Sequence, residues 1–105
     1  MLVATPAGPT EVLQLSVVIP VRNEAANIAP LVTEIEQALG GLPHEIIYVD
    51  DGSTDATPAE LRAAAAIAPL RHLRHRVSCG QSAAVVTGVR AARGRWIATL
   101  DGDGQ

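Results

Sequence analysis

Trp-Ile-Ala-Thr-Leu-Asp-Gly-Asp-Gly-Gln, residues 96–105, is an apolar run that ends in two carboxylates separated by one glycine. The run predicts a buried strand over residues 96–100, and the glycines that follow let the backbone turn sharply. Because alternate side chains on extended backbone point the same way, Asp101, Asp103 and Gln105 can face one site. Oxygen ligands of this kind suit Mg²⁺ or Mn²⁺, but Asp-Gly pairs are also frequent in simple turns. A cation site and a plain turn are therefore the two interpretations to weigh against the rest of the chain.

The same pattern, a short apolar strand followed directly by polar residues, occurs earlier in the sequence. Residues 15–20 form a β-branched run closed by proline, and the polar group Arg-Asn-Glu follows at 22–24. Residues 45–49 run into a second polar loop at 50–55, which begins with two aspartates. Apolar runs of this length predict strands that are buried on both faces. The more basic segment 70–75 is predicted as a further strand.

Helical periodicity separates these strands. Apolar residues at helical spacing predict an amphipathic helix that starts with Asn27 as N-cap and ends before the glycine pair 40–41. Thr-Pro-Ala-Glu at 57–60 has the pattern of a capping box and predicts a helix as far as about residue 68. Ser-Cys-Gly-Gln at 78–81 repeats that pattern and predicts a third helix.

Strands alternating with helices predict an α/β fold, a Rossmann-like parallel sheet with helices on both faces. Residues 15–105 are predicted to form this domain, and residues 1–14, with two prolines and a glycine, a flexible leader. In such a sheet the polar loops at 22–24, 50–55, 76–80 and 101–105 all meet at the carboxyl edge of the strands. One crevice should therefore collect them.

Composition excludes several classes of protein. The chain has 105 residues and a formal net charge of -3, and its one basic cluster, at 71–76, has no aromatic residues between the charges, which argues against nucleic-acid binding. Its single cysteine, Cys79, cannot form an internal disulfide, which fits a reducing compartment such as the cytoplasm or a reduced structural thiol. No apolar stretch is long enough to cross a membrane, and residues 1–14 lack the pattern of a secretory signal.

The sequence after the first strand separates this chain from two well-known nucleotide folds. Residues 21–26 read Val-Arg-Asn-Glu-Ala-Ala, not the Gly-x-Gly-x-x-Gly of a dehydrogenase, and the chain contains no lysine for a phosphate-binding loop. Phosphates bound here would need another counter-charge. A divalent cation held by Asp103 would supply one.

Four segments, residues 18–24, 49–55, 80–84 and 100–105, resemble the motifs of family 2 of the glycosyltransferases in order and spacing. The similarity is greatest to the dolichol- and polyprenyl-phosphate sugar transferases. The resemblance implies a GT-A fold, of which residues 15–105 would be the nucleotide-sugar-binding half, ending at the Asp-x-Asp motif.

The resemblance also implies roles for individual residues. Asp51 would hydrogen-bond the base, and Asp101 would meet the ribose or a metal-bound water. The implied nucleotide-binding residues come from three of the motifs: Pro20, Arg22, Glu24, Val49, Asp50, Asp51, Asp101 and Gly102. The implied ligands of Mn²⁺ or Mg²⁺ are Asp101, Asp103 and Gln105.

The chemistry implied by the family is metal-dependent, inverting transfer of a sugar by a single displacement. The donor would be a UDP- or GDP-sugar and the acceptor a glycan or a polyprenyl or dolichyl phosphate, which would place the full-length enzyme at the cytoplasmic face of a membrane. The family's general base is expected beyond Gln105, so this chain is expected to bind the donor but to be inactive alone. Two positions depart from the family pattern, because Arg22 replaces a frequent Tyr and Ser78 a usual Asn.

Other functions remain as alternatives to an enzyme fragment. The chain could be a non-catalytic nucleotide-binding or regulatory module without turnover. A phosphoacceptor receiver domain would also cluster carboxylates on a parallel sheet, but it normally needs a lysine, and this chain has none. Cys79 lacks the surroundings of a catalytic nucleophile. An unpaired sheet edge beside the last strand further predicts a homo-oligomer.

Overall fold

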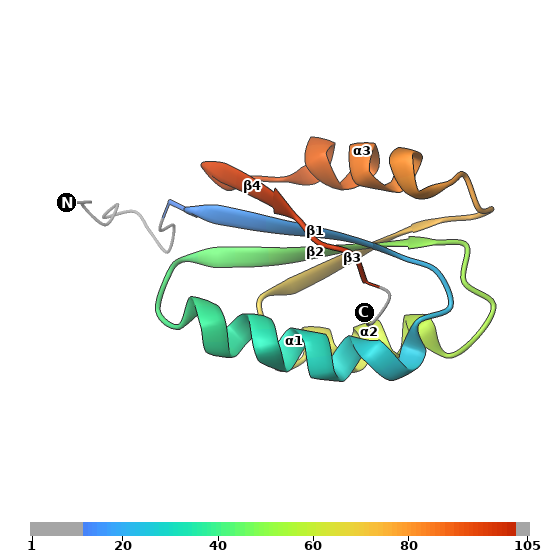
Figure 1. The fold of residues 1–105 in the computed structure, drawn as a ribbon, viewed down its shortest axis with the longest axis horizontal. Coiled ribbons are helices and arrows are strands. Elements are labelled where there is room, and N and C mark those ends of the chain that lie inside the picture. Colours follow the sequence, from blue (N-terminus) through green and yellow to red (C-terminus); the bar gives the residue numbers. More distant parts are fainter. Residues whose placement is uncertain (1–11, 103–105) are drawn as a thin grey trace.

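The computed structural model describes residues 12–102, in which strands and helices alternate along the chain (Figure 1). The strands are β1 (Leu15–Val21), β2 (His44–Asp51), β3 (Leu70–His75) and β4 (Trp96–Thr99). The helices are α1 (Ala25–Leu39), α2 (Thr57–Ala65) and α3 (Gln81–Ala91). The predicted order of elements is thus confirmed, whereas most of the predicted leader lies outside the described residues. Within residues 12–102, none of the helices has the length and apolar character that crossing a membrane requires.

The four strands form one parallel sheet in the order β3-β2-β1-β4. Helices α1 and α2 cover one face and α3 covers the other (Figure 1). This confirms the predicted α/β class with helices on both faces. The chain moves outward from β1 to β2 and β3 and then returns to place β4 on the other side of β1. Such a reversal leaves a crevice at the carboxyl ends of the strands, between the diverging connections.

Strands β1 and β2 form the centre of the core, because each is flanked by strands on both sides and by helices on both faces. Every residue of β2 is buried. Side chains that alternate along the strands face α1 and α2 on one side and α3 on the other. The larger cluster includes Ile19, Ile28, Ile46, Tyr48 and Leu61. The cluster beneath α3 is smaller and consists of Val18, Ile47, Val49 and Ala84.

The prediction of a strand over residues 96–100 is confirmed for Trp96–Thr99, but the prediction that this strand is buried is wrong. Among residues 12–102, strand β4 pairs only with β1, and the exposed fractions are 69% for Trp96, 44% for Ile97 and 40% for Leu100. An apolar run indicates a strand, but it does not say whether the strand lies at the centre or at the edge of the sheet. The open edge of β4 is the surface on which the predicted self-association would occur, and that association stays a prediction.

The predicted N-caps at Asn27, Thr57 and Ser78 are wrong. Helix α1 begins at Ala25, before Asn27, Thr57 is already the first residue of α2, and α3 begins at Gln81. None of these three helices has a side-chain hydrogen bond at its N-cap. The capping pattern assumes that a polar side chain bonds its own helix. Thr57 and Ser78 instead bond neighbouring loops, and this gives them a part in the site described below.

A buried histidine at the start of β2 gives a prediction about stability. The ring of His44 has Nδ1 2.7 Å from the carbonyl of Leu42 and Nε2 2.6 Å from the Glu36 carboxylate. Both partners only accept hydrogen bonds, so only the imidazolium satisfies both. Burial alone would lower the pKa of His44, but these two contacts outweigh burial and raise it above 6.5.

We therefore expect His44→Gln to reduce the free energy of unfolding by about 1 kcal/mol below about pH 6, and by less near pH 9. The sign follows from the raised pKa. The extra stability is present in full below the pKa of the unfolded chain and is lost as the pH rises through the folded-state pKa. Urea unfolding of both proteins at the two pH values measures the difference. An equal loss of unfolding free energy at both pH values would show that the charge of His44 contributes nothing to stability.

Candidate functional site

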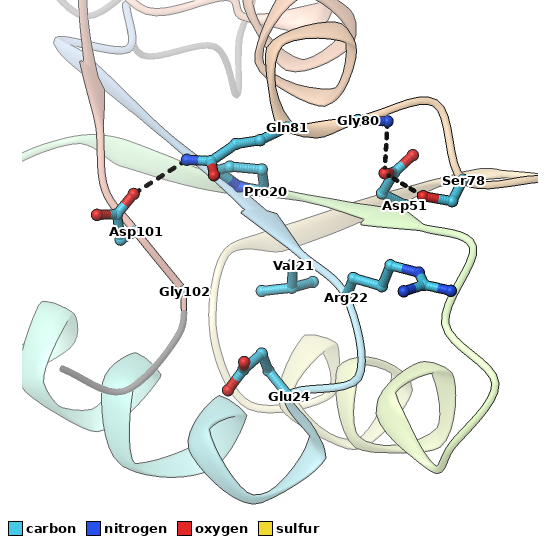
Figure 2. Close-up of a pocket in the computed structure, with 10 residues that line it drawn as sticks. All are labelled: Pro20, Val21, Arg22, Glu24, Asp51, Ser78, Gly80, Gln81, Asp101 and Gly102. Carbon is cyan, nitrogen blue, oxygen red and sulfur yellow. Dashed lines mark hydrogen bonds between the residues drawn. The ribbon is translucent and has the colours of Figure 1, made fainter.

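A cavity of about 320 Å³ lies at the carboxyl edge of the sheet, where β1 and β2 end and the segment after β4 begins (Figure 2). Most of the residues predicted to bind a nucleotide line it together: Pro20, Arg22, Glu24, Asp51, Asp101 and Gly102. They come from the carboxyl ends of β1 and β2 and from the segments that follow β1 and β4. The structure therefore brings the predicted polar loops to one crevice, as the topology requires.

Two predicted residues do not line this cavity. The side chain of Val49 is fully buried in the cluster beneath α3. Asp50 is 1% exposed, and its Oδ1 accepts a hydrogen bond of 2.8 Å from the Ser53 N–H, so it shapes the loop after β2. Its Oδ2 lies 3.9 Å from Nε of Arg74. The predicted metal ligands Asp103 and Gln105 lie outside the described residues.

The loops after β1 and β2 are held together by hydrogen bonds along their length. Asn23, in a left-handed conformation with φ 55°, donates its N–H to Ser53 Oγ at 2.8 Å. Its side-chain oxygen accepts the N–H of Thr54, also at 2.8 Å. One residue on, the Glu24 N–H donates to Thr57 Oγ1 at 3.0 Å. Glu24 is thus fixed at the cavity by a contact that is unrelated to helix capping.

Asp51 anchors the loop between β3 and α3. Its Oδ1 accepts hydrogen bonds from His75 Nδ1 at 2.8 Å and from the Cys79 N–H at 2.7 Å. Its Oδ2 accepts from the Ser78 hydroxyl and the Gly80 N–H, both at 2.9 Å. Burial alone would raise the pKa of Asp51, but these four donors outweigh burial and hold it far below its ordinary value. The carboxylate therefore stays ionised and fixes residues 78–80 at the rim of the cavity.

Two glycines allow the loops to approach so closely. A side chain on Gly52, which has φ +75°, would place its Cβ 2.7 Å from the Ser78 nitrogen. A side chain on the buried Gly102 would collide with the side chain of Val21. Only glycine permits these contacts, because both neighbours are part of the packed structure. The segment after β4 can therefore lie directly against the end of β1.

Asp101 lies on the opposite side of the cavity from Asp51 (Figure 2). It is exposed, and its Oδ1 accepts a hydrogen bond of 3.1 Å from Nε2 of Gln81, the first residue of α3. Arg22 lies on the same side as Asp51. The cavity thus has carboxylates at both ends and, among its described lining residues, a single cationic side chain.

Two places in the described structure offer metal-ligating atoms. Asp51, His75 and Cys79 each present one such atom, all within 4.8 Å of one another. However, each carboxylate oxygen of Asp51 already accepts two hydrogen bonds. The two ring nitrogens of His75 are hydrogen-bonded to Asp51 and Thr87. A mixed oxygen, nitrogen and sulfur set also suits softer ions than Mg²⁺ or Mn²⁺. The exposed carboxylate of Asp101 is the donor that fits a hard cation.

The sequence places the loop 76–80 at the crevice but assigns no individual site role to Ser78, Gly80 or Gln81, although all three line the cavity. Their Ser-x-x-Gln spacing predicts a capping box instead. The signal for a site role is the segment 80–84, which resembles a family motif.

Comparison with known proteins connects this geometry to a family. The profile of Glycosyl transferase family 2 matches residues 16–105. The dodecaprenyl-phosphate galacturonate synthase of Rhizobium johnstonii is 44% identical over 99 residues, which are 90% of this chain and 29% of that protein. The dolichol-phosphate mannosyltransferase of Pyrococcus furiosus is 36% identical over 91 residues, 87% of this chain and 26% of that protein. The chain thus spans less than a third of these relatives.

Solved structures show the same architecture. A mannosyltransferase from Pyrobaculum calidifontis, in complex with GDP-Man and Mn²⁺, superposes with a TM-score of 0.77 at 29% identity, over 90% of this chain and 29% of that one. The glucosyl-3-phosphoglycerate synthase of Mycobacterium tuberculosis, in complex with Mn²⁺, UDP and glucosyl-3-phosphoglycerate, gives a TM-score of 0.70 at 28% identity. The match covers 85% of this chain and 33% of that one.

Proposed function

This chain belongs to glycosyl transferase family 2, and on that premise we propose that it forms the donor-binding part of a sugar transferase that uses a UDP- or GDP-sugar. The observation that carries the proposal is the cavity at the strand reversal, with Asp51 at one end and Asp101 at the other. Ligands of open α/β sheets bind at this position. Relatives named as polyprenyl-phosphate sugar transferases support sugar transfer as the reaction.

We place the base of the nucleotide at the end of the cavity formed by Asp51 and Ser78. Four protein donors already use the Asp51 carboxylate, and a carboxylate has about four lone-pair positions. A base N–H must therefore replace one of them. Ser78 is the donor that can leave, because its side chain is exposed and its hydroxyl can turn to water. The other donors are two backbone N–H groups and the ring of His75.

Electrostatics favour a divalent cation near Asp101. The described lining carries the carboxylates of Glu24, Asp51 and Asp101 against the guanidinium of Arg22, so a diphosphate would meet net repulsion. We propose that Asp101, together with Asp103 and Gln105, holds Mn²⁺ or Mg²⁺. When bound, the cation would neutralise the departing nucleoside diphosphate. Support comes from the structures of relatives that contain Mn²⁺.

For the whole protein we propose inverting transfer by a single displacement to an acceptor such as a polyprenyl or dolichyl phosphate, at the cytoplasmic face of a membrane. The relatives that support this acceptor are more than three times longer than the region they share with this chain. We therefore place the catalytic base and the acceptor site in sequence beyond Gln105. Residues 15–105 alone should bind the donor without turnover, because a general base must reach the acceptor hydroxyl.

Calorimetric titration of UDP and GDP, each with and without Mn²⁺, tests the donor site. We expect one of the two nucleotides to bind, with Mn²⁺ present, at least tenfold more tightly than without it, an effect of roughly 1.4 kcal/mol or more. Asp101→Ala and Asp103→Ala should each remove most of that gain. If a folded chain binds neither nucleotide under any condition, the proposal of a donor site is wrong.

A further inference from the structure

Gln81 connects the two ends of the cavity. Its side-chain Nε2 donates a hydrogen bond of 3.1 Å to Asp101 Oδ1, while the residue before it, Gly80, donates its N–H to Asp51 Oδ2 at 2.9 Å. The backbone here is further fixed because the Gly80 carbonyl accepts the N–H of Ala84 at 3.1 Å, within the first turn of α3. The backbone at Gln81 is thus held at a set position relative to the sheet, and the exposed side chain extends from this fixed point to Asp101.

The carboxylate of Asp101, by contrast, has little else to hold it. The backbone on either side is fixed, because Leu100 donates its N–H to the Val18 carbonyl at 3.0 Å and Gly102 is buried, but the Asp101 side chain is exposed. Among residues 12–102, Gln81 is the one side chain that hydrogen-bonds the Asp101 carboxylate, and Oδ2 has no protein partner there. Without that bond the carboxylate could rotate freely. Carboxylates that ligate metals are usually oriented by a hydrogen bond of this kind.

Gln81 also lies where two cavities meet. A second cavity of about 330 Å³ shares Pro20, Gln81 and Asp101 with the first and continues toward Val85 and Leu100. The hydrogen bond between Gln81 and Asp101 therefore joins two residues that line both cavities.

We infer that Gln81 is a positioning residue, which holds Oδ1 of Asp101 so that the carboxylate is preset for the divalent cation of the donor complex. The inference rests on the proposed function, because it assumes that Asp101 serves the cation. A neutral amide suits this role, since it donates one hydrogen bond without adding a charge that would compete with the cation. Gln81 itself need not touch the nucleotide.

The test uses Gln81→Met, which keeps the length and helix propensity of the side chain but removes the donor. Gln37→Met is the matched control, because Gln37 is exposed on α1, away from the cavity. For each protein, the affinity for whichever of UDP or GDP binds the unaltered chain is measured over a series of Mn²⁺ concentrations. We expect Gln81→Met to need about tenfold more Mn²⁺ for half of the maximal affinity. At saturating Mn²⁺ its nucleotide affinity should match that of the unaltered chain.

Each other outcome has a distinct meaning. An unchanged Mn²⁺ requirement in Gln81→Met would overturn the positioning role while leaving the donor site intact. Weaker nucleotide binding even at saturating Mn²⁺ would also overturn it, because Gln81 would then contact the nucleotide directly. Absence of nucleotide binding by the unaltered chain would instead refute the proposed function on which the inference rests.

Discussion

Replacing Asp51 by alanine should lower the free energy of unfolding by about 3 kcal/mol and abolish nucleotide binding by the protein that stays folded. The reason is the number of groups that depend on this one side chain. The N–H groups of Cys79 and Gly80, the Ser78 hydroxyl and the ring of His75 all donate to it. Alanine leaves them without an acceptor and releases the loop that forms the rim of the cavity.

The contribution of Asp51 to stability depends on pH through the pKa of its carboxyl group, which lies far below its ordinary value of 3.8. A carboxyl group with a lowered folded-state pKa contributes stability in full above the unfolded value and loses that contribution as the pH falls through the folded value. The gap in stability between the unaltered chain and Asp51→Asn should therefore be constant between about pH 5 and 7 and should narrow below about pH 4. Urea unfolding over this range measures it.

Ser78→Ala is the matched control for Asp51→Ala. It removes only one of the four donors, at an exposed position where water can take its place, so the loss of stability should stay below about 1 kcal/mol. If the base replaces the Ser78 hydroxyl, this variant should also keep its nucleotide affinity. A loss of binding as complete as that of Asp51→Ala would show that Ser78 itself is needed for the ligand.

The behaviour of Ser78 shows which part of the structure could be predicted from the sequence. The order of strands and helices and the common edge of the polar loops follow from local patterns, since apolar runs and helical spacing are properties of neighbouring residues. The use of Ser78 depends on Asp51, which is 27 residues away in the chain. A capping pattern contains no information about such a distant partner, so it predicted that Ser78 bonds its own helix and not Asp51.

The difference between local patterns and partners distant in the sequence also explains why the exposure of β4 and the role of Gln81 were not predicted. The apolar run of 96–100 predicts a strand, but its exposure depends on which elements lie beside it. Gln81 and Asp101 belong to separate motifs, and their hydrogen bond appears only when the start of α3 and the end of β4 are placed together. The residues that line the cavity were largely predictable from the motifs, whereas the contacts that orient them were not.

Another buried carboxylate, that of Glu45, lies at the amino edge of the sheet, opposite the cavity. Glu45 is 5% exposed, and its Oε2 accepts the Ser16 hydroxyl at 2.6 Å and the Arg93 N–H at 2.7 Å. Its Oε1 accepts two nitrogens of Arg71, at 2.9 and 3.2 Å. Burial alone would raise the pKa of Glu45, but these contacts lower it below its ordinary value. One side chain thereby joins β1, β2, β3 and the connection from α3 to β4.

Glu45→Ala should consequently cost about 3 kcal/mol of unfolding free energy, because it leaves the Arg93 N–H and the Ser16 hydroxyl without their acceptor and Arg71 without its counter-ion. The exposed Glu34 on α1 supplies the control, and Glu34→Ala should change stability by less than about 0.5 kcal/mol. Urea unfolding of both variants measures the difference. A Glu45→Ala protein as stable as Glu34→Ala would mean that water replaces the network at no cost.

Comparison of Glu45→Ala with Asp51→Ala separates stability from binding. The two carboxylates lie on the same strand, about 20 Å apart at roughly 3.3 Å per residue, and they stabilise opposite edges of one sheet. Under conditions in which both variants are mostly folded, Glu45→Ala should keep the Mn²⁺-dependent nucleotide affinity of the unaltered chain and Asp51→Ala should lose it. If both lose it in proportion to their instability, the cavity depends on the global stability of the sheet, and Asp51 has no specific role in holding the nucleotide.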